Sequence, residues 1–319
     1  MNLYGEIKQK STVIDWTETD LLEKRSIVFP VPQNHPRYST IKQYCLMVIQ
    51  LSNYHFLEND LILCDSAISN LLTEQIRNLP AIIFLDPTED KLKTKKEADI
   101  FVHQHSGKAY DRVIVIGGGV LANFGGYVAE SLKTNLVYVP TTVIAMSDAC
   151  IGGKVRLNDI QDGVYTKHSY KSFYEPSEIV LDPRFLSNLT DEQVRIGLAE
   201  IIKHAIYQSP LLAEYILSDI FQPFTDKQSL LRVILWTADL KRICLEIDPE
   251  ESKDGSYLIL RAAHDISDGL EEKSRFSLPH GAAVEKAMIE DLYSQKEKYN
   301  LLLEIYTKLG IGCTNFSDQ

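Results

Sequence analysis

A glutamate, a lysine and three histidines stand at spacings that could assemble a metal site. In the segment GLAEIIKHA, Glu200, Lys203 and His204 lie three and four residues apart, which places them on one face of a helix. His264 and His280 follow, sixteen residues apart. One carboxylate and two imidazoles suit a catalytic zinc, which keeps a position open for substrate. Taken by themselves, the two histidines would more often be separate structural residues.

A second candidate site is a glycine run at the end of an apolar strand. Val113–Ile116 is short and β-branched, as expected of a buried parallel strand, and it runs into Gly117–Gly119. A stretch with helical spacing and a second strand, Leu136–Val139, follow. The segment therefore predicts a βαβ unit that binds phosphate at a helix N-terminus. The glycines alone fit an ordinary chain reversal equally well.

Polar residues follow the second strand. Thr141 and Thr142 come directly after it, where side chains at a strand end face a binding crevice, and Asp148 and Gly152-Gly153-Lys154 come next. The pattern GGGVxxxxxGxxA, then VPTT, then an aspartate ahead of GGK, resembles the dehydroquinate synthase family of sugar-phosphate cyclases. The later motif GLAExxK and the two histidines strengthen the resemblance, which extends from about residue 60 to about residue 310.

The resemblance implies NAD and Zn²⁺ (or Co²⁺) as cofactors. It implies that Glu200, His264 and His280 bind the metal, whereas His204, which the family pattern skips, is structural. Asp65 is equally explained as a helix N-cap. The implied NAD contacts are Asp65, Glu89, Gly117, Gly118, Gly119, Asn123, Thr141, Thr142 and Asp182.

The resemblance also implies a group of charged side chains around a sugar phosphate. Any one of the lysines, taken alone, would more often be a solvated surface charge. Lys133 matches a basic residue that reaches the phosphate site of a partner subunit in the family, which implies a homodimer. The implied catalytic residues are Asp148, Lys154, Lys167, Lys203, Lys241, Arg261 and Asp268.

The chain departs from the family pattern at several of these positions. Asn123 replaces an aspartate, and His168 stands where an asparagine is expected after Lys167. The stretch from Lys154 to Lys167 is about four residues longer than usual, which we interpret as a phosphate-type loop with an insertion. Around His264, Tyr257, Arg261 and Asp268 replace an arginine, an asparagine and a histidine. The family's last active-site lysine has no counterpart, because the sequence stops at residue 319.

Composition limits the class of protein. The 319 residues are 45% hydrophobic and 24% charged, which is typical of a globular protein, and no apolar run or N-terminal signal core is long enough for a membrane or secretory segment. The net charge of −11 argues against nucleic acid as a general partner. Five scattered cysteines without CxxC spacing predict reduced thiols and a cytoplasmic location.

The order of the elements predicts an α/β fold. Strands and helices alternate up to about residue 186, which is typical of a doubly wound parallel sheet, and long helical periodicities follow. We expect an N-terminal nucleotide-binding α/β domain (1–186), strand-rich at its start, and an all-helical metal- and substrate-binding domain (187–319). The expected strands are 27–31, 61–64, 81–85, 113–116 and 136–139; the expected helices are 67–77, 91–105, 191–207, 210–217, 227–248, 258–273 and 281–308.

The resemblance implies a carbon–oxygen lyase, in which NAD transiently oxidises a hydroxyl, phosphate is eliminated and a carbocycle closes. Asp268 would repel a substrate carboxylate by about 4 kcal/mol at roughly 4 Å in an intermediate dielectric. The sequence therefore favours a secondary-metabolism cyclase acting on a ketose phosphate such as sedoheptulose 7-phosphate. The alternatives are a 3-dehydroquinate synthase of the shikimate pathway and a non-catalytic NAD-binding descendant. A metal-dependent glycerol dehydrogenase fits less well, because it needs no lysine cluster.

Overall fold

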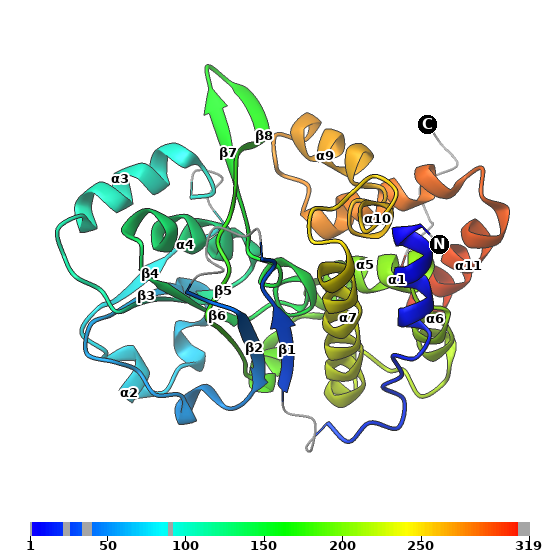
Figure 1. The fold of residues 1–319 in the computed structure, drawn as a ribbon, viewed down its shortest axis with the longest axis horizontal. Helices are drawn as coiled ribbons and strands as arrows, with labels where there is room; N and C mark the ends of the chain where they lie inside the picture. Colours follow the sequence, from blue (N-terminus) through cyan, green and yellow to red (C-terminus); the bar gives the residue numbers. More distant parts are fainter. Residues whose placement is uncertain (1, 22–25, 34–39, 89–91, 312–319) are drawn as a thin grey trace. The chain divides into compact units, whose positions relative to one another are not determined.

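The computed structural model describes residues 2–21, 26–33, 40–88 and 92–311. The chain divides into two compact units (Figure 1). One unit, Leu22–Asn188, is the α/β unit; the other, the helical unit, combines Met1–Leu21 with Leu189–Gln319. The expected boundary after residue 186 lies close to the boundary between Asn188 and Leu189. The expected assignment of the first 21 residues to the α/β domain was wrong, because they belong to the helical unit.

The α/β unit is built on a sheet of seven strands within the described ranges. Their order across the sheet is β1-β2-β9-β6-β5-β3-β4, and β1 is antiparallel to β2 while the other pairs are parallel. The central strands β5 and β6 are almost fully buried, as their continuous apolar sequences predict. The strands are β1 (Ser26–Pro30), β2 (Gln43–Val48), β3 (Asp60–Asp65), β4 (Ile82–Leu85), β5 (Arg112–Gly117), β6 (Asn135–Pro140) and β9 (Glu178–Leu181).

Helices cover both faces of this sheet. Figure 1 shows α3 (Lys95–His105) and α4 (Gly119–Leu132) on one face and the short α2 (Glu74–Arg77) on the other. α4 packs closely on β5, because a Cβ on Gly125 would lie only 2.3 Å from Val115 Cγ2. The expected helix over 67–77 is instead a 3₁₀ helix followed by α2, since the Thr73 side chain caps a new start.

The parallel register brings three strand ends to one edge of the sheet. Cys64 of β3 is level with Ile116 of β5, and Gly117 is level with Pro140 of β6. The residues that follow these strands therefore begin side by side, at the edge where open α/β sheets bind ligands.

A separate two-stranded ribbon projects from the α/β unit (Figure 1). It consists of β7 (Lys154–Gln161) and the antiparallel β8 (Val164–Phe173). The expected phosphate-type loop between Lys154 and Lys167 is therefore wrong: the additional residues extend a hairpin, which turns at Asp162 and Gly163, both with positive φ.

The helical unit is organised around α5 (Asp191–Tyr207), which is buried along nearly all of its length from Val194. It packs against α6, α7, α8, α10 and α11. These helices are α6 (Pro210–Leu217), α7 (Lys227–Ile247), α8 (Tyr257–Leu260), α9 (His264–Lys273), α10 (His280–Leu292) and α11 (Lys296–Leu309). Among the residues that the structure describes, no helix combines the length and hydropathy that a membrane span requires.

The N-terminal helix α1 (Leu3–Ser11) belongs to this helical unit. Asn2 caps it, and it packs against α7. Farther along, the indole of Trp16 is fully buried and donates a hydrogen bond to Asp239 of α7 at 3.1 Å. Residues 1 to about 58 were expected to be strand-rich: β1 and β2 confirm this for their part, whereas residues 3–11 form a helix of the helical unit.

Candidate metal and cofactor sites

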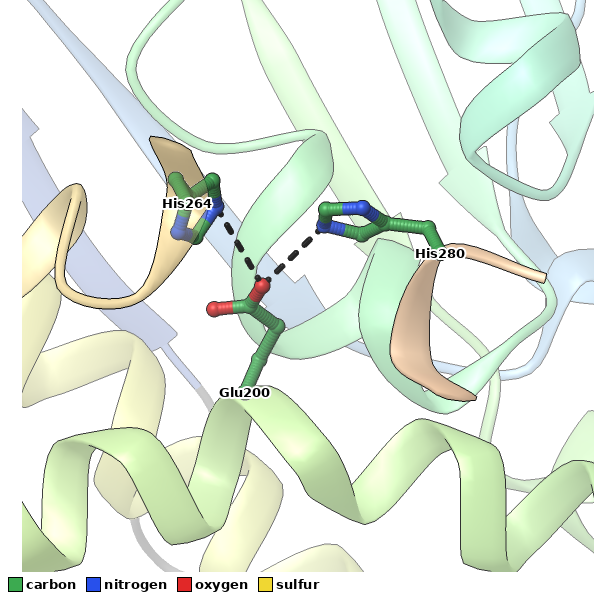
Figure 2. Close-up of side chains that lie close together, drawn as sticks. All are labelled: Glu200, His264 and His280. Carbon is green, nitrogen blue, oxygen red and sulfur yellow. Dashed lines mark hydrogen bonds and ion pairs between the residues drawn. The ribbon is translucent and has the colours of Figure 1, made fainter. Parts of the chain in front are cut away.

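Three side chains from three helices meet around one carboxylate oxygen. Glu200 lies within α5, His264 is the first residue of α9 and His280 is the first residue of α10. The Nε2 atoms of His264 and His280 lie 3.6 Å and 3.2 Å from Glu200 Oε1. Figure 2 shows one imidazole ring on each side of that oxygen. The potential ligand atoms of the three residues all lie within 4.8 Å of one another.

The backbone determines where each of these side chains stands. Glu200 is fully buried on the central helix. Ala263 has φ 60°, a left-handed conformation that separates α8 from α9 and places His264 at the start of the new helix. Gly281 lets the first turn of α10 contact the main chain of α5, so His280 is held next to Glu200.

Further contacts orient the ligand atoms. His264 Nδ1 lies 3.0 Å from the Ala262 carbonyl oxygen, and His280 Nδ1 lies 2.7 Å from Glu271 Oε1. An N–H at each Nδ1 leaves a lone pair on each Nε2. Lys203 forms an ion pair with Glu200 Oε2 and donates to the Leu260 carbonyl at 3.0 Å.

Glu271 was missed by the sequence analysis. A signal for it was present, since it lies seven residues after His264, two turns farther along the same helix face.

The protonation states of this cluster suit metal ligands. Burial acts to raise the pKa of Glu200, but Lys203 and the two imidazoles together hold it well below its usual value. Burial, followed by the charge of Lys203, lowers the pKa of His264 to about 3. Glu200 is therefore an anion and His264 is neutral near pH 7, the forms in which carboxylate and imidazole bind metals.

The spacing of the donor atoms fits a small divalent metal ion. Zinc binds imidazole nitrogen at about 2.0–2.1 Å and carboxylate oxygen at about 2.0–2.2 Å, so two tetrahedral ligands stand about 3.4 Å apart. The observed 3.6 Å and 3.2 Å separations bracket that value. His204 is outside this group: it is fully buried, and its Nδ1 lies 2.5 Å from Gln208 Oε1. The three remaining residues fit Zn²⁺ or Co²⁺ with a coordination position left over.

In the α/β unit, the glycine turn lies at the shared strand edge. Thr141 donates its N–H to the Gly117 carbonyl at 3.1 Å. Cβ atoms built on Gly117 and Gly118 would lie 3.5 Å from Asp65 Cβ and 3.1 Å from Thr142 Cγ2. α4 begins at Gly119, so its first N–H groups stand at this edge beside both threonines. The arrangement suits a pyrophosphate.

Other expected cofactor residues have partners within the protein. Asp65 accepts from the Ala67 N–H at 2.9 Å and is an N-cap, while burial raises the pKa of its carboxyl. The Asn123 amide donates to the Gly119 carbonyl at 2.8 Å and accepts from the Arg156 N–H at 2.6 Å. Glu89 lies outside the described residues.

The buried Asp182 carboxylate binds the Arg184 guanidinium at 2.5 Å and the Leu51 N–H at 2.8 Å. Asp182 and Asn123 therefore have clear structural roles beside any cofactor contact.

The expected lysines and acid fall in both units. Asp148 lies on a π-helical turn, Ala145–Ala149, a geometry that is common at functional sites. Lys154 begins β7, and Lys167 is buried in β8. Lys241 is buried in α7, which packs against α5. Lys203 lies in α5 and forms an ion pair with Glu200, one of the metal-ligand candidates.

Arg261 is paired with two acids. Its guanidinium lies 3.0 Å from Asp268 and 3.3 Å from Asp265. Burial works against the charge of Arg261, but Asp268 and Asp265 raise its pKa overall. Arg261 and Tyr257 also line a cavity of about 360 Å³ in the helical unit, which none of the three metal-ligand candidates lines.

Comparison with known sequences finds similarity to 3-dehydroquinate synthases and to 2-deoxy-scyllo-inosose synthases. The family model described as "3-dehydroquinate synthase N-terminal" matches residues 84–196. A 3-dehydroquinate synthase from Sulfurisphaera tokodaii is 32% identical over 56% of this chain and 50% of its own length. A 2-deoxy-scyllo-inosose synthase from Streptomyces lividus is 28% identical over 72% of this chain and 61% of its own length.

A solved structure of another synthase has a similar fold. The 2-epi-5-epi-valiolone synthase ValA from Streptomyces hygroscopicus, solved with NAD⁺ and Zn²⁺ bound, superposes with a TM-score of 0.67 at 22% identity, covering 84% of this chain and 81% of that one. The chain spans about half to two thirds of the length of the curated relatives it matches. At this identity the structural likeness establishes the fold.

Proposed function

The chain belongs to the dehydroquinate synthase-like family, and from this premise we propose that it is an NAD- and metal-dependent sugar-phosphate cyclase, a carbon–oxygen lyase that eliminates phosphate and closes a carbocycle. The observation that carries the proposal is the convergence of Glu200, His264 and His280 on one point, with donor spacings that suit a divalent metal. The glycine edge at Gly117–Gly119 supports the NAD component.

The two cofactors supply the reactive chemistry: when bound, NAD⁺ accepts and returns a hydride, and the metal polarises a substrate hydroxyl as a Lewis acid. The residues of the chain hold and orient these groups. The N-terminal turn of α4 directs N–H groups toward a pyrophosphate. Lys203 forms an ion pair with Oε2 of Glu200, and Oε1 of the same carboxylate faces the two imidazoles.

This contact defines a role for Lys203. Because its ammonium is paired with Glu200 and a backbone carbonyl, its role is to hold the carboxylate ionised and in place. On the family resemblance, we assign to Lys154, Lys167 and Lys241 the attraction of the substrate phosphate and the stabilisation of charge that develops when phosphate leaves.

For the substrate, we propose a neutral sugar phosphate, such as the ketose phosphate sedoheptulose 7-phosphate. The support is the pairing of Arg261 with Asp265 and Asp268, so that two carboxylates already bind its guanidinium. A guanidinium paired in this way is less available to a substrate carboxylate, whereas the carboxylate oxygens accept hydrogen bonds from sugar hydroxyls.

A panel of substrates tests the proposal. Purified protein is incubated with NAD⁺, Zn²⁺ or Co²⁺ and, separately, sedoheptulose 7-phosphate, glucose 6-phosphate and the seven-carbon keto-acid phosphate of the shikimate route. Released phosphate and the carbocyclic product are measured. Turnover of sedoheptulose 7-phosphate alone supports the proposal. Turnover of the keto-acid phosphate alone would favour the 3-dehydroquinate synthase alternative. NAD binding without turnover of any of the three would favour a non-catalytic descendant.

The variant Asp268→Asn sharpens the substrate test. It removes one of the two anions beside Arg261, so the guanidinium regains attraction for a carboxylate. We expect the ratio of kcat/KM for the keto-acid phosphate to that for the neutral sugar to rise. The control is Asp254→Asn, an exposed acid in the same unit, for which the ratio is expected to stay unchanged.

We further propose that the protein acts as a homodimer in which Lys133 serves the phosphate site of the partner subunit. Lys133 is exposed at the end of α4, with φ 56°, and is thus positioned on the surface of its own chain. Light scattering gives the oligomeric state. Mixing Lys133→Ala subunits with Lys167→Ala subunits would restore activity if the two lysines act across the subunit boundary.

A further inference from the structure

Glu271 is a buried carboxylate that contacts one of the two histidines of the metal cluster. Its Oε1 lies 2.7 Å from His280 Nδ1, on the side of the ring opposite the Nε2 that faces Glu200. The residue is 7% exposed. Glu271 and His264 lie two turns apart on α9, so one helix carries a metal-ligand candidate and also the partner of the other histidine.

The two histidines are held in the same tautomer by different acceptors. His264 Nδ1 faces a neutral backbone carbonyl, that of Ala262, whereas His280 Nδ1 faces a carboxylate. A carboxylate that accepts the Nδ1 hydrogen fixes the ring orientation and makes Nε2 a stronger electron donor. Glu271 also adds a negative charge to the cluster, in which the ammonium of Lys203 already offsets the negative charge of Glu200.

We propose that Glu271 is a positioning residue for the metal: it orients the His280 ring, fixes its tautomer and strengthens its bond to the ion. The inference rests on the proposed function, since it assumes that Glu200, His264 and His280 bind a divalent metal. Glu271 is no ligand itself, because the imidazole of His280 stands between it and Glu200.

The test is the affinity of the purified protein for Co²⁺, measured by competition with a chromophoric chelator and by the visible absorption of bound Co²⁺. Glu271→Gln keeps the shape of the side chain but removes its charge, and its amide can bond either tautomer of the ring. We expect the affinity to fall about 10- to 100-fold, the usual effect of losing such a partner. The matched control is Glu272→Gln, which removes the same charge from the next position of α9 and should leave the affinity unchanged.

A merely structural role for Glu271 is distinguished by a second variant. Glu271→Asp keeps the charge but shortens the side chain, so it should recover more of the Co²⁺ affinity than Glu271→Gln, even if its melting temperature is lower. Wild-type affinity in a folded Glu271→Gln protein would overturn the inference and leave the proposed function intact. Equal losses in both variants that follow their melting temperatures would also overturn it. If the wild-type protein binds no Co²⁺ or Zn²⁺ at all, the proposed function fails, and the inference with it.

Discussion

Gly281 lies directly against the main chain of Ile196. A Cβ on Gly281 would stand 2.1 Å from the Ile196 carbonyl oxygen and 2.7 Å from its Cγ2. The first of these atoms belongs to the backbone of α5, so it has no rotamer by which to move away. The separation between α5 and the start of α10, and with it the separation between Glu200 and His280, depends on the absence of one methyl group.

The variant Gly281→Ala should therefore impair the metal cluster. Overpacking a buried contact costs about 1–3 kcal/mol, and here the relief is a shift of α10 that moves His280 away from Glu200. We expect a lower melting temperature and a loss of metal affinity. Gly269→Ala on α9 is the control, because a Cβ there meets no atom within 4 Å. Equal metal affinity in the two variants would show that α10 can shift without cost to the cluster.

Removal of one ligand tests the metal assignment directly. His264→Ala leaves Glu200 and His280 as the remaining protein ligands. Because a catalytic zinc usually has three protein ligands, we expect the variant to lose most of its bound zinc. Metal analysis of the purified variant measures this. His103→Ala, at an exposed histidine of α3, is the control and should retain wild-type metal content. Full occupancy in the His264 variant would be incompatible with the assignment.

A larger side chain in the glycine turn should block NAD. In Gly118→Val the new side chain occupies the space where the pyrophosphate would approach α4, while its Cβ must also displace the Thr142 methyl group, which stands 3.1 Å away. We expect calorimetry to detect no NAD binding and circular dichroism to show a folded protein. Adding Thr142→Ser removes the internal contact. If the double variant regains NAD binding, the defect comes from Thr142 and the glycine turn is not the pyrophosphate site.

Glu285 makes the stability of the helical unit depend on pH. Burial raises the pKa of its carboxyl from 4.5 to about 7, although Arg195, 2.6 Å away, acts in the opposite direction. Between these two values the folded state holds more protons than the unfolded state, so the contribution of Glu285 to stability falls as the pH rises from about 4.5 to about 7.

The corresponding variant is Glu285→Gln, compared with the wild type by chemical denaturation at several pH values. We expect the wild type to lose free energy of unfolding relative to the variant over that interval, and the difference to level off above pH 7. Glu290→Gln, at an exposed position of the same helix, controls for the loss of one negative charge. A difference that is constant from pH 4.5 to pH 8 would show that Glu285 titrates normally.

Much of the fold could be predicted from short-range sequence signals. α5 and α6 have the predicted bounds, because each has a strong start: a capping box at Thr190 and a serine cap followed by Pro210. The buried strands β5 and β6 were equally clear from their continuous apolar sequences. The grouping of Glu200 with His264 and His280 was implied by the resemblance to the dehydroquinate synthase family.

Features that depend on tertiary contacts could not be predicted in the same way. The expected helix over 258–273 is interrupted at Ala263, which takes a left-handed conformation although alanine has the highest helix propensity. The strand β8 of the hairpin is largely polar, so it lacks the continuous apolar sequence that marks β5 and β6. The ion pair of Arg261 with Asp268 joins residues whose separate roles the sequence suggests but whose mutual neutralisation it does not.

The assignment of the first 21 residues to the helical unit has a consequence for synthesis on the ribosome. The α/β unit is one continuous segment, so it can fold as soon as it has emerged, and domains commonly fold as units in this way. The helical unit takes α1 from the segment before the α/β unit and its other helices from the segment after it. Trp16, whose indole is buried against α7, is therefore left without its partner Asp239 until more than two hundred further residues have been made. During that interval the indole of Trp16, which is fully buried in the folded protein, is exposed to solvent.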